Sequence, residues 1–335
     1  MKKLRVVQIG TEHDHAAETF DTLRKMTDCF EVLGYCPIPE DGTVKLEKRC
    51  EIYDGASRLD LEKVLSDPGV DAVVVETNDL SLTKYATLFL QKGVPVEMDK
   101  PGAPDSASFD AMMDLAAAKK IPIQLGYMYR FHPAIRELTE KIKAGELGDI
   151  LYINAEMSCF HNPEKRAWLS DYPGGMMYYL GCHLLDVVLR IQGEPLEVIP
   201  LNDKSSMDGV KSFDQGCAVL RYPRGTSFVR TTAVERGGYR RRQIVAVGTK
   251  GACQIQPTEY GERKGDWCTL HSDVRYVFES AFIASQPVYT TPAFHRYKNM
   301  LTSFYELAAG QKENPYTTDY EKKLHRLILQ ACGEK

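Results

Sequence analysis

Length, composition and charge are those of a globular protein with two domains. At 335 residues the chain is longer than one ordinary core, and 43% hydrophobic with 26% charged residues is typical of soluble proteins. A net charge of −4 argues against nucleic acid or an anionic membrane as a partner. Nine cysteines without a Cys-x-x-Cys pair indicate neither a disulfide framework nor a zinc knuckle, so we expect a reduced, cytoplasmic protein.

The first 125 residues alternate between strand and helix patterns. Short β-branched runs predict strands at 4–9, 30–36, 70–75, 94–98 and 121–125, with helices at 16–26, 59–65, 81–91 and 105–118. This alternation is typical of the α/β class, a doubly wound parallel sheet or Rossmann fold with a crevice at the carboxyl ends of its strands. We assign residues 1–125 to a dinucleotide-binding domain.

The pattern changes after residue 126. Helices are predicted at 133–144, 175–191, 296–309 and 319–331, and strands at 150–156, 214–221, 227–234, 243–247, 252–256 and 276–279. We therefore predict an α+β domain over 126–335, with a largely antiparallel open-faced sheet and a last helix that can pack back on the first domain. Its open face predicts a homodimer or homotetramer. The basic run 240–242 is interpreted as a solvated strand edge.

A degenerate loop follows the first strand. It reads Gly10-Thr11-Glu12-His13-Asp14-His15, which keeps only the first glycine of the G-x-G-x-x-G fingerprint. Glu12 stands where the backbone should meet a phosphate. The amides of the loop, and His13 or His15, remain able to contact that phosphate. A plain strand-to-helix turn is an equal alternative. The second strand ends without an arginine for a 2′-phosphate, which favours NAD, with NADP as the alternative. Thr77 and Asn78 end another strand and either contact the cofactor or cap the next helix.

A lysine and a histidine are the candidates for acid–base chemistry. Lys100 follows the strand at 94–98 and precedes Pro101, which places it at the crevice edge, although most strand-end lysines are simply solvated. His183 lies on an apolar helix, where a buried core histidine is the alternative. An amine and an imidazole in one cleft can remove and return an alcohol proton, as a nicotinamide-dependent dehydrogenase requires.

Further residues of the second domain are candidates for the substrate cleft. Aromatic faces stack on sugar rings and guanidinium groups bind hydroxyls or carboxylates; the candidates are Tyr129, Arg130, Arg166 and Trp168. A structural role is an equal alternative for each. Asp186 either orients His183 or caps neighbouring backbone. His132 and His161 lack metal-ligand spacing, so we predict no metal site.

The chain resembles the glucose–fructose oxidoreductase / inositol dehydrogenase / rhizopine-catabolism (Gfo/Idh/MocA) family over nearly its whole length. The motifs that carry the likeness are Asp99-Lys100-Pro101 for the family's Glu-Lys-Pro, GYMYRFHP at 126–133, GGMMYYLGCHLLD at 174–186 and the closing helix at 304–310. Family members use NAD or NADP to oxidise or reduce sugars, cyclitols and their derivatives. The resemblance implies that Asp99 and Lys100 contact the cofactor, that Lys100 also reaches the substrate, and that His183 is the acid–base residue.

Two departures from the family pattern bear on the function. The family's aspartate four residues before the histidine is Tyr179 here, and its Thr-Pro-Asn…His segment reads Thr77-Asn78-Asp79. The leading hypothesis is an NAD(P)-dependent oxidoreductase that acts on a secondary hydroxyl of a sugar or cyclitol. The alternatives are a redox-assisted lyase or glycoside-cleaving enzyme that recycles its NAD and uses Tyr179 as acid–base group, and a non-catalytic sugar or nucleotide sensor.

Overall fold

Two compact units make up the chain. The computed structural model describes residues 2–38, 50–264, 267–279 and 286–334. Unit 1 comprises residues 1–127 and 297–325, and unit 2 comprises residues 128–296 and 326–335. Most of the last two helices therefore group with unit 1. The sequence analysis assigned both to the second domain but allowed the last helix to pack back on the first domain.

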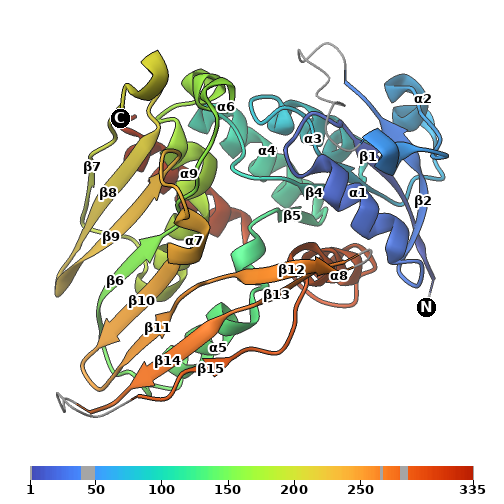
Figure 1. Cartoon of the computed structure of the whole chain (residues 1–335). Helices are drawn as coiled ribbons and strands as arrows, with labels where there is room; N and C mark the ends of the chain where they lie inside the picture. Colours follow the sequence, from blue (N-terminus) through green and yellow to red (C-terminus); the bar gives the residue numbers. More distant parts are fainter. Residues whose placement is uncertain (1, 39–49, 265–266, 280–285, 335) are drawn as a thin grey trace. The chain divides into compact units, whose positions relative to one another are not determined.

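Unit 1 contains the predicted doubly wound parallel sheet (Figure 1). Its five strands lie in the order β2-β1-β3-β4-β5 and run parallel. They are β1 (Leu4–Ile9), β2 (Phe30–Cys36), β3 (Ala72–Val75), β4 (Val96–Met98) and β5 (Ile123–Leu125), connected through helices α1 (Ala16–Lys25), α2 (Leu61–Ser66), α3 (Leu82–Lys92) and α4 (Ser106–Lys119). The strand order reverses between β1 and β3, and this switch point is where such sheets bind ligands.

The core of unit 1 includes a helix from the far end of the chain. Helix α8 (Arg296–Ala308) packs Leu301 and Phe304 against Val6 and Phe30 of the sheet. The Gln124 side chain donates to the Met300 carbonyl at 3.0 Å, which fixes α8 to the end of β5. Unit 1 therefore requires residues about 180 positions beyond its parallel strands, because they cover one face of the sheet.

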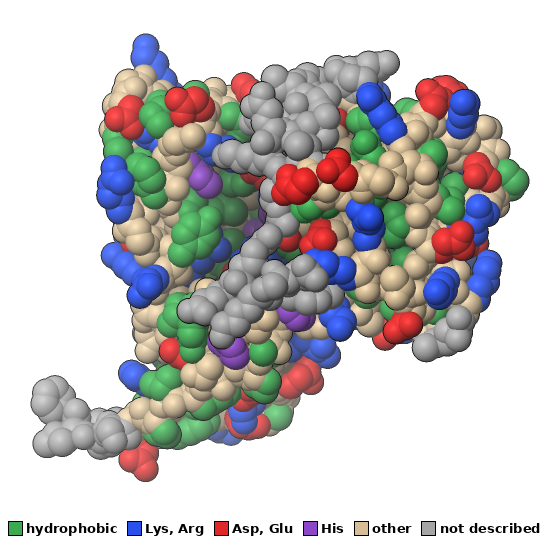
Figure 2. Space-filling view, turned by 45° about the vertical axis from the view of Figure 1, so that its right-hand side comes forward, with side chains coloured by type: hydrophobic (Ala, Val, Ile, Leu, Met, Phe, Trp, Pro, Cys, Tyr) green, Lys and Arg blue, Asp and Glu red, His purple; other side chains and the backbone are tan. Residues whose placement is uncertain are grey.

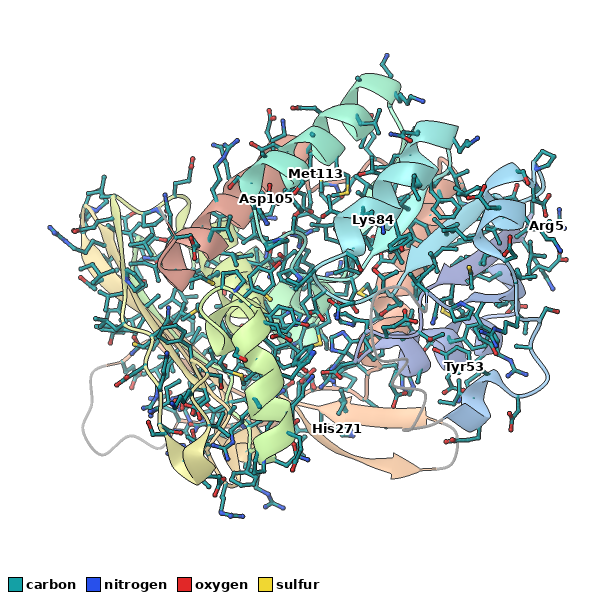
Figure 3. All side chains as sticks on the ribbon, turned by 90° about the horizontal axis from the view of Figure 1, so that it is seen from above. Arg5, Tyr53, Lys84, Asp105, Met113 and His271 are labelled. Carbon is teal, nitrogen blue, oxygen red and sulfur yellow. The ribbon has the colours of Figure 1, made fainter. Side chains whose placement is uncertain are left out.

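Two side chains labelled in Figure 3 show how the elements of unit 1 are held. Tyr53 stacks on Phe20 of α1 with ring centroids 4.7 Å apart, and this contact seals the outer side of α1. Asp105 is the N-cap of α4, where its carboxylate accepts the Ser108 amide at 2.8 Å. Such a cap satisfies an amide that the first turn of a helix otherwise leaves unpaired.

Unit 2 is an α+β domain with a largely antiparallel sheet, as predicted. The order is β15-β14-β11-β10-β6-β9-β8-β7, with β6 and β9 parallel and the other described neighbours antiparallel (Figure 1). The strands are β6 (Ile150–Glu156), β7 (Glu197–Pro200), β8 (Gln215–Tyr222), β9 (Gly225–Thr232), β10 (Gln243–Gly248), β11 (Ala252–Ile255), β14 (Asp273–Val277) and β15 (Tyr289–Thr290). A separate hairpin pairs β12 (Tyr260–Lys264) with β13 (Trp267–His271).

The helices of unit 2 leave part of the sheet exposed. They are α5 (Pro133–Lys143), α6 (Pro163–Trp168), α7 (Cys182–Gln192) and the end of α9 (Thr318–Cys332). On β9 the alternation is clear, since Val229 is fully buried while Phe228 is 45% exposed. The sequence analysis did not find β7, β12, β13, β15 or α6, because these elements are short or carry mixed polar patterns.

The predicted helix at 175–191 differs from the observed one at its start. A π-helical turn, Met177–Gly181, precedes α7, so the regular helix begins at Cys182. The glycine pair before it forms a turn: Gly174 and Gly175 have φ values of +59° and +52°. A Cβ on Gly175 would lie 2.3 Å from the Phe213 carbonyl oxygen, so only glycine fits this close approach. Single-turn π segments are often found at functional sites.

The interpretation of residues 240–242 as a solvated strand edge holds only in part, because Arg240 and Arg241 are exposed but neither lies in a strand and Arg242 is buried. A 3₁₀ helix covers Gly238–Arg241, and Arg242 that follows it is buried. The Arg242 Nε donates to the Ser158 carbonyl at 3.3 Å, and the guanidinium lies 4.1 Å from the centroid of the Tyr239 ring. A run of like charges does not reveal tertiary contacts, and it is such contacts that bury Arg242.

The visible surface carries mixed charge. Figure 2 shows acidic and basic side chains interspersed over this face instead of gathered by sign. Among the described residues, every helix is too short or too polar to cross a bilayer.

We predict that His132 makes stability fall at acidic pH. His132 caps α5 by accepting the Ile135 amide and donates from Nε2 to the Thr258 carbonyl at 3.0 Å. Burial lowers its pKa to about 4 from an ordinary 6.5, against the opposing Glu259 carboxylate. The unfolded chain takes up a proton below pH 6.5 that the folded chain refuses until about pH 4. Stability should therefore fall through this window, by roughly 3 kcal/mol.

The measurement is urea unfolding of the parent and of His132→Asn at several pH values. Asparagine keeps a capping oxygen but does not titrate, so its unfolding free energy should fall less between pH 7 and 4. Parallel losses in the two proteins would assign the acid sensitivity to other groups.

Candidate functional site

Three strand ends meet at the switch point of unit 1. The loop after β1 carries Gly10 to His15, the turn after β3 carries Glu76 to Asp79, and Asp99 and Lys100 follow β4. Gly10 has a φ of +89°, and a Cβ there would lie 2.5 Å from the Thr77 nitrogen. The loop after β1 thus lies against the buried Thr77, and the backbone approach needs the glycine that the sequence retains.

Glu12 turns its carboxylate back onto the loop. Its oxygens accept the Thr11 amide at 2.7 Å and the Ile38 amide at 3.1 Å. Burial raises the pKa of Glu12, and these hydrogen bonds oppose that rise. Backbone amides at such a strand-to-helix loop are the donors with which dinucleotide-binding folds hold phosphate. In this chain the Glu12 carboxylate occupies one of them, the Thr11 amide, together with the Ile38 amide that follows β2.

His13 lies inside a group of carboxylates. Its Nδ1 is 3.1 Å from Asp99 Oδ2 and 3.4 Å from Glu76 Oε2, and its Nε2 is 3.3 Å from Asp79 Oδ1. All four side chains are buried. Burial opposes a charge on His13, but Asp99 and Asp79 outweigh it and hold the histidine pKa well above its ordinary value. Burial together with Asp99 raises the pKa of Glu76 to about 7.

Asp99 also binds His15 and sits beside Lys100. His15 Nδ1 is 2.8 Å from Asp99 Oδ2, and the Lys100 backbone amide donates to Asp99 Oδ1 at 2.6 Å. Burial would raise the pKa of Asp99, yet His13 and His15 hold it well below the usual range. Lys100 is fully buried. Burial is the main cause that lowers the pKa of His15, and the charge of Lys100 adds to this effect, whereas Asp99 opposes it.

The sequence found part of this group. Gly10, Thr11, Glu12, His13, Thr77, Asp99 and Lys100 were predicted for the cofactor, and the structure brings them to neighbouring strand ends of unit 1. Asn78 also forms a turn, since its Oδ1 accepts the Leu80 amide at 3.0 Å just before α3, and its contact with the cofactor stays a prediction. Glu76 was missed as a site residue. Its position directly after β3 was the signal available for finding it.

In unit 2, His183 lies at the start of α7 beside Tyr129. The two ring centroids are 5.8 Å apart and both side chains are buried. Burial raises the pKa of Tyr129, as does Glu259. Lys100 belongs to unit 1 and His183 to unit 2, so their joint action on one hydroxyl remains a prediction.

Three charged residues predicted for the substrate cleft are engaged within unit 2. Asp186 accepts from Arg130 at 2.9 and 3.0 Å and pairs with Arg190 at 3.2 Å. Arg166 donates to the Met207 carbonyl at 3.0 Å and pairs with Asp208 and with Asp214. Arg130, Asp186 and Arg166 are buried, which favours the structural alternative for them.

An aromatic group surrounds Tyr179. Trp168 meets it edge-on with centroids 5.4 Å apart, and His161 lies 6.1 Å away. The Lys165 ammonium sits 3.3 Å from the Trp168 ring centroid and 4.7 Å from that of Tyr179. Trp168 is half-buried, so an aromatic face with a cation above it borders solvent. The sequence predicted Trp168 and Tyr179 but missed Lys165.

Two family models match the chain. The model described as the NAD-binding Rossmann fold of the oxidoreductase family matches residues 4–127, and the GFO/IDH/MocA C-terminal domain model matches residues 135–254. The chain belongs to the Gfo/Idh/MocA oxidoreductase family. The predicted resemblance is thereby confirmed, and so is the predicted NAD-binding Rossmann domain.

Relatives within the Gfo/Idh/MocA family are distant. The uncharacterised oxidoreductase YhhX of Escherichia coli K12 is 27% identical over 213 residues, which cover 62% of this chain and 59% of YhhX. Inositol 2-dehydrogenase 1 of Saccharopolyspora erythraea is 32% identical over 128 residues, 36% of this chain and 37% of that enzyme. The chain thus matches less than two thirds of either relative's length.

A solved structure shares the fold over nearly the whole chain. A 3-ketoreductase from Actinomadura kijaniata, in complex with NADP and TDP-benzene, superimposes with a TM-score of 0.79 at 16% identity. The superposition covers 98% of this chain and 96% of the ketoreductase. At this identity the likeness establishes the fold alone.

Unit 1 fits the dinucleotide of the Gfo/Idh/MocA family with one obstacle. The close approach of Gly10 to Thr77 shapes the loop, and the loop ends at the switch point where such cofactors bind. The obstacle is Glu12, because its carboxylate bonds the Thr11 and Ile38 amides. A phosphate can use those donors once the carboxylate has turned away.

We predict that removing this carboxylate tightens dinucleotide binding. Glu12→Gly frees the amides of Thr11 and Ile38 and removes a like charge, so the binding free energy of NAD should improve by about 1–2 kcal/mol. Glu12→Gln removes the charge while keeping a side chain, and it should give a smaller gain. Isothermal calorimetry measures all three proteins, with Glu31→Gln on the exposed side of β2 as the control. Equal or weaker binding by Glu12→Gly would show that the carboxylate supports the cofactor.

Proposed function

We propose that the protein is an NAD(P)-dependent oxidoreductase that acts on a secondary hydroxyl of a sugar, a cyclitol or a derivative. The observation that carries the proposal is the fully buried Lys100 at the end of β4, within an NAD-binding Rossmann unit. A lysine buried beside Asp99 at a switch point is costly unless it serves a ligand or a buried partner. The similarity to inositol 2-dehydrogenase 1 of Saccharopolyspora erythraea supports this substrate class.

Lys100 and His183 share the proton transfer in this proposal. When bound, the dinucleotide supplies the hydride acceptor or donor. Lys100 binds the substrate hydroxyl and the cofactor ribose. Burial raises the pKa of Asp79, but His13 and, to a smaller extent, the charge of Lys100 lower it overall, as expected if the amine lies close to this carboxylate. His183, buried at the start of α7, takes up or returns the hydroxyl proton. Tyr179, in the π turn before it, replaces the family carboxylate as a hydrogen-bond donor.

The aromatic group of unit 2 provides the sugar-binding surface. Trp168 and Tyr179 offer faces to the apolar side of a sugar ring, and the Lys165 ammonium can bind a ring hydroxyl or a negatively charged substituent. Tyr129 is buried beside His183, with the two ring centroids 5.8 Å apart, and packs against the proton-transfer residue. The buried Arg130, Arg166 and Asp186 hold the unit in place.

We predict that both proton-transfer residues are required for turnover. Lys100→Ala and His183→Ala should each lower kcat by about 10²–10⁴-fold, the usual contribution of an acid–base group. NAD binding should survive in His183→Ala and weaken in Lys100→Ala, because only the lysine also contacts the cofactor. The control is Lys84→Ala, an exposed lysine of α3. Near-normal turnover of His183→Ala would make the histidine a core residue.

The same assay separates the alternative functions. The absorbance of reduced nicotinamide is followed while sugars, cyclitols and glycosides are supplied with NAD or NADP. Net reduction supports the dehydrogenase. Product without net reduction supports a lyase that recycles its NAD. Binding without product supports a sensor, the alternative that the Glu12 contacts favour.

We further propose a homodimer or homotetramer that forms through the open sheet face of unit 2. Phe228 on β9 is 45% exposed, and burying such a side chain against a second copy is favourable. Phe228→Asp should lower the molar mass measured by light scattering at micromolar concentration. Leu80→Asp, which alters an exposed apolar residue of unit 1, should leave it unchanged. A parent protein that is already monomeric would refute the assembly.

A further inference from the structure

We propose that His13, His15 and Asp99 form a binding site for a divalent transition-metal ion of the zinc class. The three ligand atoms lie within 4.8 Å of one another. They come from the loop after β1 and the end of β4, both at the switch point of unit 1. The sequence analysis predicted no metal here, and the proposed oxidoreductase function does not depend on one.

The ligand atoms lie near one another but not at the separations of a zinc coordination shell. Asp99 Oδ2 is 3.1 Å from His13 Nδ1 and 2.8 Å from His15 Nδ1. Zinc bonds of about 2.0–2.2 Å in a tetrahedron place ligand atoms roughly 3.2–3.6 Å apart. The two imidazole rings are 4.8 Å apart at a plane angle of 68°, so both turn Nδ1 toward one carboxylate oxygen. To bind an ion, Asp99 Oδ2 has to move away from both Nδ1 atoms, and His13 Nδ1 has to give up the His15 amide that donates to it at 3.2 Å.

Two further carboxylates complete the surroundings. Asp79 Oδ1 is 3.3 Å from His13 Nε2, the ring nitrogen that a metal on Nδ1 would leave as a donor. A carboxylate that accepts from a metal-bound imidazole is a recurrent second-shell arrangement. Glu76 Oε2 is 3.4 Å from His13 Nδ1 and is buried without a hydrogen bond to any described residue. A metal ion bound to His13 Nδ1 would place a positive charge close to the Glu76 carboxylate oxygen.

The formal charges around the site favour a dication. Glu76, Asp79 and Asp99 are three buried carboxylates, and Lys100 beside them supplies one positive charge. Metal-bound imidazoles are neutral. The remaining charge, with all three acids ionised, is then two negative units, which a divalent cation balances. Two nitrogens and one carboxylate oxygen suit zinc, cobalt or iron better than magnesium or calcium.

The test uses the full chain stripped with a chelator and then titrated with Co²⁺ or Zn²⁺. One equivalent of Co²⁺ should bind and give visible d–d bands, and Zn²⁺ should displace it and raise the melting temperature. His15→Asn and Asp99→Asn remove a ligand and should weaken binding by more than about 100-fold, beyond the 10–100-fold expected for the second-shell change Asp79→Asn. His295→Asn, a half-buried histidine elsewhere, is the control.

Each outcome decides for or against the site. Binding that the ligand variants lose and the control keeps supports it. Unchanged binding in His15→Asn and Asp99→Asn, a thiolate charge-transfer band from cysteine ligation, or less than stoichiometric binding by the parent would overturn it. If a ligand variant fails to fold by circular dichroism, Asp79→Asn still decides, because it keeps all three ligands and must weaken binding. NAD affinity, measured on the same metal-free protein, tests the proposed function separately.

Discussion

The buried Asp99 carboxylate is the interaction on which the strand-end group of unit 1 depends. One of its oxygens faces both His13 and His15, and the other accepts the Lys100 amide. An isolated buried carboxylate is costly, so these contacts explain why it can remain ionised away from solvent. They also fix the loop after β1 to the end of β4, across β3. The lysine next in sequence is thereby held in the same place.

Glu12 places a carboxylate of the protein itself in the loop that, in dinucleotide-binding folds, usually binds the phosphate of a ligand. Its bonds to Thr11 and Ile38 satisfy amides that would otherwise face a phosphate or water. The loop is therefore complete without a ligand, and a ligand competes with the protein for the same donors. This differs from a glycine-rich loop, which leaves its amides available.

Periodicity predicted the fold better than it predicted the site. Strands such as β1, with Val6, Val7 and Ile9 fully buried, are continuous apolar runs that a parallel sheet requires. The short β7 and β15 and the polar β12-β13 hairpin lack that signal. The site residues Lys100 and Glu12 were recognisable from their motifs. Glu76 was not, because its contact with His13 joins the ends of strands that are distant in sequence and adjacent in the sheet.

The return of the chain to unit 1 bears on how this fold can be divided. The polypeptide passes between the units at residues 127–128, 296–297 and 325–326. A fragment that ends at residue 127 would lack α8, and the apolar side chains of Leu4, Val6 and Phe30 that this helix covers would face water. The unit with the Rossmann fold is thus one compact body built from two separate segments of the sequence.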